Sequence, residues 1–330
     1  MRPGGLIVGL TGATGHIGGL VLERLASDPA VAEIRSVARR PLGPAAAALM
    51  TGRSAHVCAD LRDEEARRAL EGVDLLYHLG AQVWQGPGRD GLANMWEVNV
   101  EGTRKVLRAR PGGVVLVSSA ATYGAWPDNP LPLHEGCKPS PNHECPYAGQ
   151  KLLAEAVTAQ EHGNWAVVRL AAVLGPHADA RVARAVQGYR TAVPAVRGVR
   201  QAVQWLWEDD AADGVVAIGR WLASASAPVG GEVFNIATDD WLSAEDAART
   251  AASRVVRVPN ELLLAGARVG RWAGVTPFGA DRAVLIGGPL ALSVAKAGRV
   301  LGWRPAVSSA QVLAGALERG WRHSPMNRQL

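Results

Sequence analysis

Short apolar runs alternate with amphipathic stretches along the first half of the chain. The apolar runs are rich in Val, Ile and Leu, and they lie at 6–11, 34–38, 55–58, 75–79, 114–118 and 165–170. Helical spacing of apolar positions fills the gaps, at 18–26, 64–70, 96–109 and 147–161. Short strands without a polar face, joined by helical crossovers, are typical of a parallel sheet covered on both faces. The pattern therefore predicts an α/β fold with a doubly wound parallel sheet, the Rossmann fold.

The alternation weakens after about residue 170. A helical stretch at 178–190 precedes an apolar segment at 203–207, and a helix at 210–223 leads to a strand at 232–236. The remainder is mostly helical, with Pro and Gly breaks. We therefore expect a dinucleotide-binding domain at 1–170, to which 203–236 returns, and a smaller substrate-binding domain at 171–202 and 237–330. Ligands of such folds bind at the carboxyl ends of the strands.

Composition excludes several classes of protein. Of the 330 residues, 48% are apolar, which is too many for a disordered chain. The net charge of +5 is diffuse, and the basic residues form no aromatic-interleaved stripe for nucleic acid. No segment approaches the roughly 20 apolar residues of a membrane span. The three cysteines have no metal-ligand spacing and suit a reducing compartment, so we expect a cytoplasmic protein without a metal.

A glycine-rich turn follows the first predicted strand directly. Its sequence, TGATGHIG at 11–18, places Gly12 for a tight turn, Gly15 for close approach of a pyrophosphate, and Gly18 for packing of strand on helix. The N-terminus of the following helix offers free N–H groups and a partial positive charge to phosphates. The turn predicts a dinucleotide site.

The end of the second strand indicates which dinucleotide. NAD-binding folds usually carry an acidic residue here for the ribose hydroxyls, whereas this chain has Arg39 and Arg40. Guanidinium groups suit a 2′-phosphate, so NADP(H) is favoured and NAD(H) stays possible. The alternative is that both arginines are solvated loop residues. Asp60 and Leu61, after the third strand, could contact the adenine ring, unless Asp60 is an ordinary helix cap.

Tyr147 and Lys151 are four residues apart, so a helix would place them one turn apart on one face. An ammonium group nearby would lower the pKa of the phenol and let it exchange a proton with a substrate oxygen. Ser119, at the end of the fifth strand, supplies a hydroxyl for the same oxygen. The three residues predict an acid/base site.

With these motifs, the sequence resembles an extended short-chain dehydrogenase/reductase of the NAD-dependent epimerase/dehydratase family. The resemblance covers nearly the whole chain. It rests on TGATGHIG at 11–18, DL at 60–61, HLGAQV at 78–83, NVEGT at 99–103, VSSAATYG at 117–124, PYAGQKLLAE at 146–155, VVRLAAVLGP at 167–176, WEDDAADG at 207–214, GEVFNIA at 231–237 and LGWRP at 301–305.

The resemblance implies a role for each matching position. Ser119, Tyr147 and Lys151 would be the catalytic triad. It also implies a homodimer that pairs the helices at 96–109 and 147–161. The residues expected to contact the cofactor are Gly12, Thr14, Gly15, His16, Ile17, Gly18, Arg39, Arg40, Asp60, Leu61, Leu79, Gly80, Ala81, Asn99, Val117, Tyr147 and Lys151.

Departures from the family pattern bear on the reaction. Sugar-nucleotide dehydratases carry an acidic pair where this chain has Ala120 and Ala121, so dehydration is disfavoured. The 4-epimerases usually carry an Asn where Ala172 stands and an Arg for the diphosphate near Val203, although Arg200 could substitute. Each lost charge-assisted bond is worth roughly 1.5–3 kcal/mol, which disfavours a nucleotide sugar.

Aromatic residues indicate a different substrate. Four tryptophans are expected to line an apolar substrate site, with ordinary core packing as the alternative: Trp84, Trp126, Trp205 and Trp207. His177 occupies a position where some relatives have a substrate-facing His, and the alternative is a solvated loop His.

The sequence as a whole predicts an NADP(H)-preferring oxidoreductase for a small, fairly apolar ketone or alcohol, with neither nucleic acid nor membrane as partner. The first alternative is a nucleotide-sugar 4-epimerase with tightly bound NAD. A remote alternative is a cofactor-sensing protein without catalysis, although such relatives typically lose the Tyr or the Lys.

Overall fold

The computed structural model describes residues 5–85, 90–224, 227, 230–276 and 278–318. The chain divides into two compact units. Unit 1 comprises Met1–Ser118, Gly149–Arg169 and Ala212–Phe234. Unit 2 comprises Ser119–Ala148, Leu170–Ala211 and Asn235–Leu330. The chain crosses between the units at the end of the fifth strand and within the first turn of the helix that carries Tyr147.

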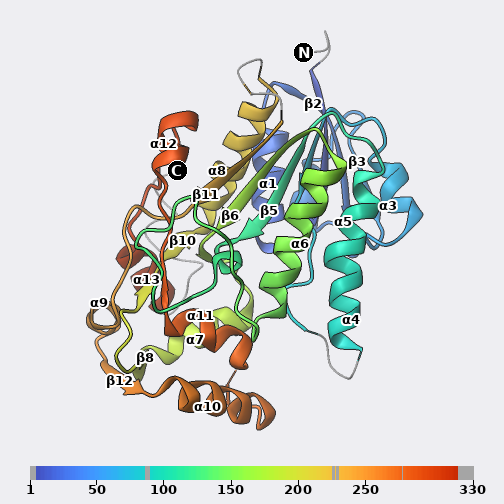
Figure 1. The fold of residues 1–330 in the computed structure, drawn as a ribbon. Coiled ribbons are helices and arrows are strands. Elements are labelled where there is room, and N and C mark those ends of the chain that lie inside the picture. The colour runs from blue at the N-terminus through green and yellow to red at the C-terminus, as the bar shows by residue number, and fades with distance from the viewer. Residues whose placement is uncertain (1–4, 86–89, 225–226, 228–229, 277, 319–330) are drawn as a thin grey trace. The chain divides into compact units, whose positions relative to one another are not determined.

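Unit 1 is built on a seven-stranded parallel sheet with the order β11-β6-β5-β4-β1-β2-β3 (Figure 1). Its central strands are short and buried on both faces, which is why they read as continuous apolar runs. The order reverses direction between β1 and β4, the type of switch point at which doubly wound sheets bind ligands. The strands are β1 (Leu6–Thr11), β2 (Val31–Ala38), β3 (Ala55–Cys58), β4 (Leu75–His78), β5 (Val114–Ser119), β6 (Asn164–Leu170) and β11 (Gly230–Ile236).

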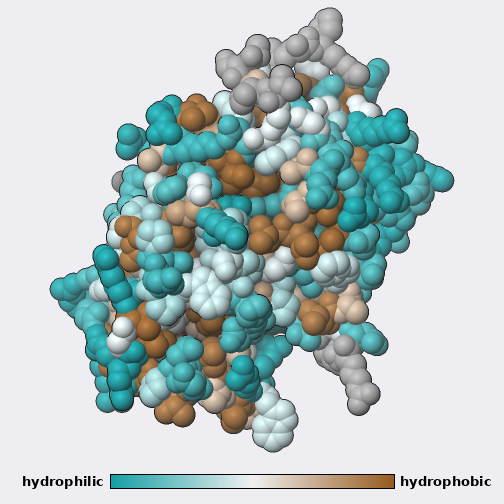
Figure 2. Space-filling model, viewed as in Figure 1, coloured by the Kyte–Doolittle hydropathy of each residue, from teal (hydrophilic) through white to brown (hydrophobic). Residues whose placement is uncertain are grey.

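Helices cover both faces of this sheet. In Figure 1, α5 and α6 lie on the near face, and α1 and α8 lie behind it. The exposed charged side chains of α3 contribute to the hydrophilic surface at the right of Figure 2. The helices are α1 (His16–Ala26), α2 (Pro44–Ala48), α3 (Glu64–Ala69), α4 (Gly91–Trp96), α5 (Gly102–Leu107), α6 (Pro146–Glu161) and α8 (Glu208–Leu222).

Unit 2 combines short parallel strand pairs with helices. Its core gathers Leu174, Tyr189, Trp205, Trp207 and Leu313. The pairs are β10 (Trp205–Trp207) with β7 (Ala172–Leu174), β12 (Arg254–Val258) with β8 (Ala192–Val196), and β13 (Pro289–Leu290) with β9 (Ala202–Val203). The helices are the 3₁₀ turn η2 (Ala120–Tyr123), α7 (Ala180–Gly188), α9 (Ala244–Thr250), α10 (Asn260–Trp272), α11 (Ala280–Gly287), α12 (Ala295–Leu301) and α13 (Ser309–Leu317).

The predicted fold class is confirmed, and one local detail differs. The expected helix at 96–109 is divided, because a π-helical turn, η1 (Glu97–Glu101), separates α4 from α5. By compactness, unit 2 takes in residues 119–148 and 203–211, which lie inside the ranges expected for the dinucleotide-binding domain. The segment at 203–207 pairs with β7 and β13 rather than with the large sheet. No helix in the described ranges is long and apolar enough to span a membrane.

Candidate functional site

The glycine turn at the end of β1 has the tight geometry that the sequence predicts. Gly12 adopts φ +78°, and a Cβ there would lie 2.9 Å from the backbone nitrogen of Gly80. A Cβ on Gly18 would lie 2.0 Å from the carbonyl oxygen of Gly12. Gly15 is the N-cap residue of α1 and carries no side chain that could block the helix N-terminus. The N–H groups of Gly12 and Gly15 donate to the carbonyls of Val37 and Gly12, so the N–H groups left for an anion are those of the first turn of α1.

A buried relay holds the end of β4 against this turn. The Oγ1 atom of Thr11 accepts a hydrogen bond from the Gly80 N–H over 3.0 Å and lies 2.7 Å from Nδ1 of His78. The Thr103 hydroxyl donates to the carbonyl of Asn99, so His78 must donate from Nε2 to Thr103 over 2.9 Å. Burial, assisted by the charge of Lys151, lowers the pKa of His78 to about 3. The imidazole is therefore neutral, and Nδ1 accepts from Thr11.

Asn99 lies in the π-helical turn and ties three segments of unit 1 together. Its Oδ1 accepts from the backbone N–H of Gln82 over 2.7 Å, and its Nδ2 donates to the Gln82 carbonyl over 3.0 Å and to Oε1 of Gln150 over 2.9 Å. Gln150 precedes Lys151 on α6. The predicted cofactor residue Asn99 therefore connects the loop after β4 to the helix of the predicted catalytic lysine.

The two arginines at the end of β2 are both exposed. Arg40 extends back over the glycine turn, where its Nη2 donates to the carbonyl of Thr14 over 2.9 Å. The charge of Arg39 contributes to lowering the pKa of Asp60. The structure thus gathers these cations near the glycine turn and the end of β3.

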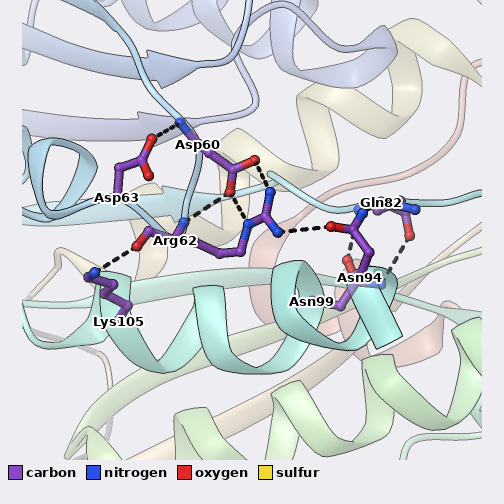
Figure 3. Close-up of polar contacts among 7 residues, drawn as sticks. All are labelled: Asp60, Arg62, Asp63, Gln82, Asn94, Asn99 and Lys105. Carbon is purple, nitrogen blue, oxygen red and sulfur yellow. Dashed lines mark hydrogen bonds and ion pairs between the residues drawn. The ribbon is translucent and has the colours of Figure 1, made fainter. Parts of the chain in front are cut away.

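Asp60, predicted to contact adenine, is already held by Arg62 (Figure 3). Arg62 donates to its two carboxylate oxygens over 2.8 and 3.0 Å, and this pairing is the main reason why the pKa of Asp60 is lowered. Arg62 also donates to Asn94, whose Nδ2 donates to Oε1 of Gln82. Lys105 donates to the Arg62 carbonyl over 2.6 Å. This network links the end of β3 to α4, α5 and the loop after β4.

The other expected cofactor residues belong to the same region of unit 1. Leu61 lies against Gly80, because a Cβ on Gly80 would approach the Leu61 side chain to 3.0 Å. The rest lie on the glycine turn, the first turn of α1, the loop after β4 and strand β5: Thr14, His16, Ile17, Leu79, Ala81 and Val117.

Lys151 is buried on α6, with 4% of its surface exposed. Burial lowers the pKa of its ammonium group to about 8, and the carboxylate of Glu155, one turn further along, opposes the shift. Glu155 itself accepts hydrogen bonds from Ser118 and Arg169. Among the described residues, no hydrogen-bond partner of the Lys151 ammonium group is found. Leaving a mostly buried cation without a hydrogen-bond partner is costly.

Ser119 ends β5 and caps the 3₁₀ turn that follows. Its Oγ accepts from the backbone N–H of Ala121 over 3.2 Å, which leaves the hydroxyl hydrogen free to point elsewhere. Ala121, at the position where dehydratases carry an acidic residue, packs in a cluster of unit 2 that also includes Tyr147. Ser119 and Tyr147 therefore belong to one unit and adjoin one apolar cluster.

Tyr147 lies in the first turn of α6, one turn before Lys151. Burial raises the pKa of its phenol, and the guanidinium of Arg282, 4.9 Å from the ring centroid, opposes this rise. The sequence predicts activation of the phenol by Lys151 together with an oxidised nicotinamide, and it gives no sign of Arg282, which lies 135 positions further along the chain on α11. No local pattern in the sequence indicates this contact.

The four tryptophans predicted at the substrate site are divided between the two units. Trp84 belongs to unit 1, and the other three belong to unit 2. Trp205 and Trp207 are 6% and 5% exposed within the unit 2 core, the arrangement that the core-packing alternative describes. Trp126 is partly exposed and donates from Nε1 to the carbonyl of Ser140 over 2.6 Å.

His177 is exposed, and it is not simply solvated. Its Nδ1 lies 2.7 Å from Oε1 of Glu208, a carboxylate that no motif in the sequence indicates.

No group of metal-ligating side chains occurs in the part of the chain that the structure describes.

Comparisons with known proteins agree with this architecture. The sequence profile of the NAD-dependent epimerase/dehydratase family matches residues 8–237, so the chain belongs to this family of enzymes. This confirms the resemblance carried by the motifs.

Individual proteins and solved structures share little sequence identity with this chain. The chain is 26% identical over 257 residues to a Sinorhizobium fredii protein, y4nG, and the match covers 75% of this chain and 63% of that protein. Its fold is similar to the NAD-bound dTDP-glucose 4,6-dehydratase DesIV of Streptomyces venezuelae, with a TM-score of 0.71, 22% identity and 98% of each chain covered. It is also similar to UDP-glucuronic acid 4-epimerase of Bacillus cereus, with a TM-score of 0.69, 18% identity, and 94% of this chain and 98% of that one covered. At these identities the structures support the fold alone.

Proposed function

We propose that this protein is an NADP(H)-preferring oxidoreductase that interconverts a carbonyl and a secondary alcohol on a small, fairly apolar substrate. The observation that carries the proposal is the state of Lys151. Its side chain is 4% exposed, and its ammonium group, one helical turn from Tyr147, has no hydrogen-bond partner among the described residues. A cofactor ribose would supply the missing acceptors.

The residues present fit a dinucleotide. The glycine turn has the close approach to Gly80 and the bare helix N-terminus that a pyrophosphate needs, and a Cβ at Gly12 or Gly18 would collide with backbone. When bound, the nicotinamide would supply or accept the hydride at the substrate carbon. Tyr147 would give or take the proton at the substrate oxygen, and Ser119 would donate a hydrogen bond to that oxygen.

Preference for NADP(H) is supported by the charges at the end of β2. Arg39 and Arg40 are exposed, and no carboxylate stands beside them in the sequence to accept ribose hydroxyls. Arg40 lies against the glycine turn through Thr14, so its guanidinium is held near the phosphate-binding backbone. NAD(H) remains the second possible cofactor, since the structural relatives named above hold NAD.

A nucleotide-sugar 4-epimerase is the second candidate, favoured by the fold similarity to the Bacillus cereus enzyme. Two positions argue against it. Val203 is 7% exposed and packs in the unit 2 core, and Ala172 has no side-chain polar group. Arg200 is exposed and is the remaining candidate for a diphosphate contact.

The expected homodimer is part of the proposal. The family pairs the helices that here span 96–109 and 147–161. Trp96 on α4 and Leu153 on α6 are 40% and 41% exposed, which is high for large apolar side chains and consistent with a partner surface.

The test compares Tyr147→Phe with Tyr189→Phe. Tyr189 is a buried tyrosine of unit 2, and its hydroxyl has no hydrogen-bond partner in the described structure. We expect Tyr147→Phe to abolish NADPH-dependent reduction of a panel of cyclic ketones while NADPH affinity stays within about twofold, and Tyr189→Phe to stay active. Retained activity in Tyr147→Phe would contradict the assignment. Release of stoichiometric, non-exchanging NAD⁺ on denaturation would favour the epimerase instead.

A further inference from the structure

A second polar site lies at the carboxyl ends of two paired strands in unit 2. Strands β7 and β10 run parallel, with Leu174 opposite Trp207. The residues that follow them are therefore neighbours: Gly175, Pro176 and His177 after β7, and Glu208 after β10. Carboxyl ends of parallel strands are where α/β proteins commonly bind ligands.

The carboxylate of Glu208 is buried and fixes His177 at two points. Glu208 is 2% exposed. Its Oε2 accepts from the backbone N–H of His177 over 3.0 Å, and its Oε1 lies 2.7 Å from Nδ1 of the same residue. A Cβ on Gly175 would lie 2.1 Å from Cδ of Glu208, so the glycine makes room for this carboxylate. The His177 side chain is 64% exposed beyond the contact.

This contact determines the tautomer of the imidazole. An ionised carboxylate can only accept hydrogen bonds, so Nδ1 of His177 must carry the proton. In the neutral ring, the exposed Nε2 is then a hydrogen-bond acceptor with a fixed direction. A solvent-exposed histidine needs no buried carboxylate to satisfy its hydrogen bonds. The fixed orientation of His177 therefore suggests a binding role for its exposed nitrogen.

We propose that His177 and Glu208 form a hydroxyl-recognition site, in which Nε2 of His177 accepts a hydrogen bond from a substrate hydroxyl group and Glu208 acts as a positioning residue. The assignment rests on the proposed function, since the hydroxyl would belong to the molecule that Tyr147 and Ser119 act on, two residues of the same unit. An anionic group is disfavoured, because Glu208, Asp209 and Asp210 follow one another in the chain.

Glu208→Gln tests the positioning role directly. The amide oxygen can still accept from the His177 N–H, while the amide nitrogen would donate to Nδ1 and force the proton onto Nε2. Nitrogen-15 histidine spectra of the whole protein at pH 8 should show the Nδ1–H tautomer for His177 in the wild type and the Nε2–H tautomer in the variant. An Nε2–H tautomer in the wild type would overturn the inference.

The ligand is tested with a matched pair of probes, 4-hydroxycyclohexanone and cyclohexanone. Adding the hydroxylated ketone to the NADPH complex should shift the Nε2 resonance of His177, and cyclohexanone should not. This titration needs no turnover, and the tautomer measurement above tests the His177–Glu208 contact without any substrate, so a failure of the reductase assignment can be told apart from a failure of this inference. Equal shifts with both probes, or with neither, would overturn the inference.

Kinetics supply the last readout where the ketones are reduced. Loss of one good hydrogen bond corresponds to about a tenfold change. His177→Ala and Glu208→Gln should each raise KM for 4-hydroxycyclohexanone about tenfold more than they raise KM for cyclohexanone. His143→Ala, at another exposed histidine of unit 2, is the matched control and should change neither. An equal loss with both ketones would indicate a merely structural role and contradict the inference.

Discussion

The guanidinium of Arg40 donates a hydrogen bond to the carbonyl oxygen of Thr14 over 2.9 Å. This contact brings the end of β2 onto the glycine turn, across 26 residues of sequence. It gives Arg40 two tasks, to hold the turn and to present positive charge beside it. Arg39, the preceding residue, is also exposed, and no hydrogen bond from it to the turn occurs among the described residues.

The two arginines can therefore be separated by mutation. Arg40→Ala should raise the Kd of NADPH roughly 10- to 100-fold, because a charge-assisted bond to a phosphate contributes about 1.5–3 kcal/mol. The Kd of NADH should change much less. Fluorescence titration of both cofactors measures the ratio. Arg39→Ala should act in the same direction more weakly.

A parallel loss of NADH binding in Arg40→Ala would assign the residue to the turn rather than to the cofactor phosphate. Arg35→Ala is a suitable control, since Arg35 is paired with Glu33 on β2. Its removal should leave both cofactor affinities unchanged.

The contact between Arg282 and Tyr147 predicts a pH effect. Burial raises the pKa of the phenol, and the guanidinium favours the phenolate and so limits that rise. Arg282→Met removes the charge, so the pKa of Tyr147 should increase further. In the direction of alcohol oxidation, which needs the phenolate as base, the acidic limb of kcat/KM should move to higher pH by the same amount.

Arg282→Lys keeps a positive charge near the ring and should shift this limb less than Arg282→Met. The pH profiles of the two variants and the wild type form one series. If all three limbs coincide, the ionisation that controls turnover is not coupled to Arg282.

Much of unit 1 could be predicted from the sequence because its signals are local. The strand at 6–11, the turn with Gly12, Gly15 and Gly18, and the helix after it follow from apolar runs and backbone geometry. The π-helical turn at Glu97–Glu101 could not be predicted, since its residues suit an ordinary helix. Unit 2 was harder, because its short strand pairs depend on contacts between distant segments.

The candidate site shows the same division. The spacing of Tyr147 and Lys151 is a local property of one helix. Other contacts join residues that are distant in the sequence. His78 meets Thr103, Glu208 meets His177 and Arg282 meets Tyr147, at separations of 25 to 135 positions. The sequence indicates candidate side chains, but only the fold determines which tautomer each one adopts and which charged groups lie beside it.

The buried ammonium group of Lys151 should make stability depend on pH in cofactor-free protein. Its pKa is about 8 in the folded chain, against an ordinary 10.5. Between these values the unfolded chain binds more protons than the folded one, so the free energy of unfolding gains a contribution that increases with pH. Below pH 8 the lysine is charged in both states, and the full penalty of burying the charge is present.

Lys151→Met removes this penalty while keeping a side chain of similar length. At pH 7 the variant should be more stable than the wild type by up to roughly 3 kcal/mol, the free energy that corresponds to the pKa shift. The difference should shrink steadily above pH 8 and vanish near pH 10.5, although the variant has lost its function. Urea unfolding of both proteins at several pH values measures it, and subtracting the curves cancels the other titrating groups, such as Cys145 and Tyr147. A variant less stable than the wild type at pH 7 would contradict this prediction. It would mean that Glu155 already compensates for the buried charge of Lys151, so that keeping this charge costs the folded protein no stability.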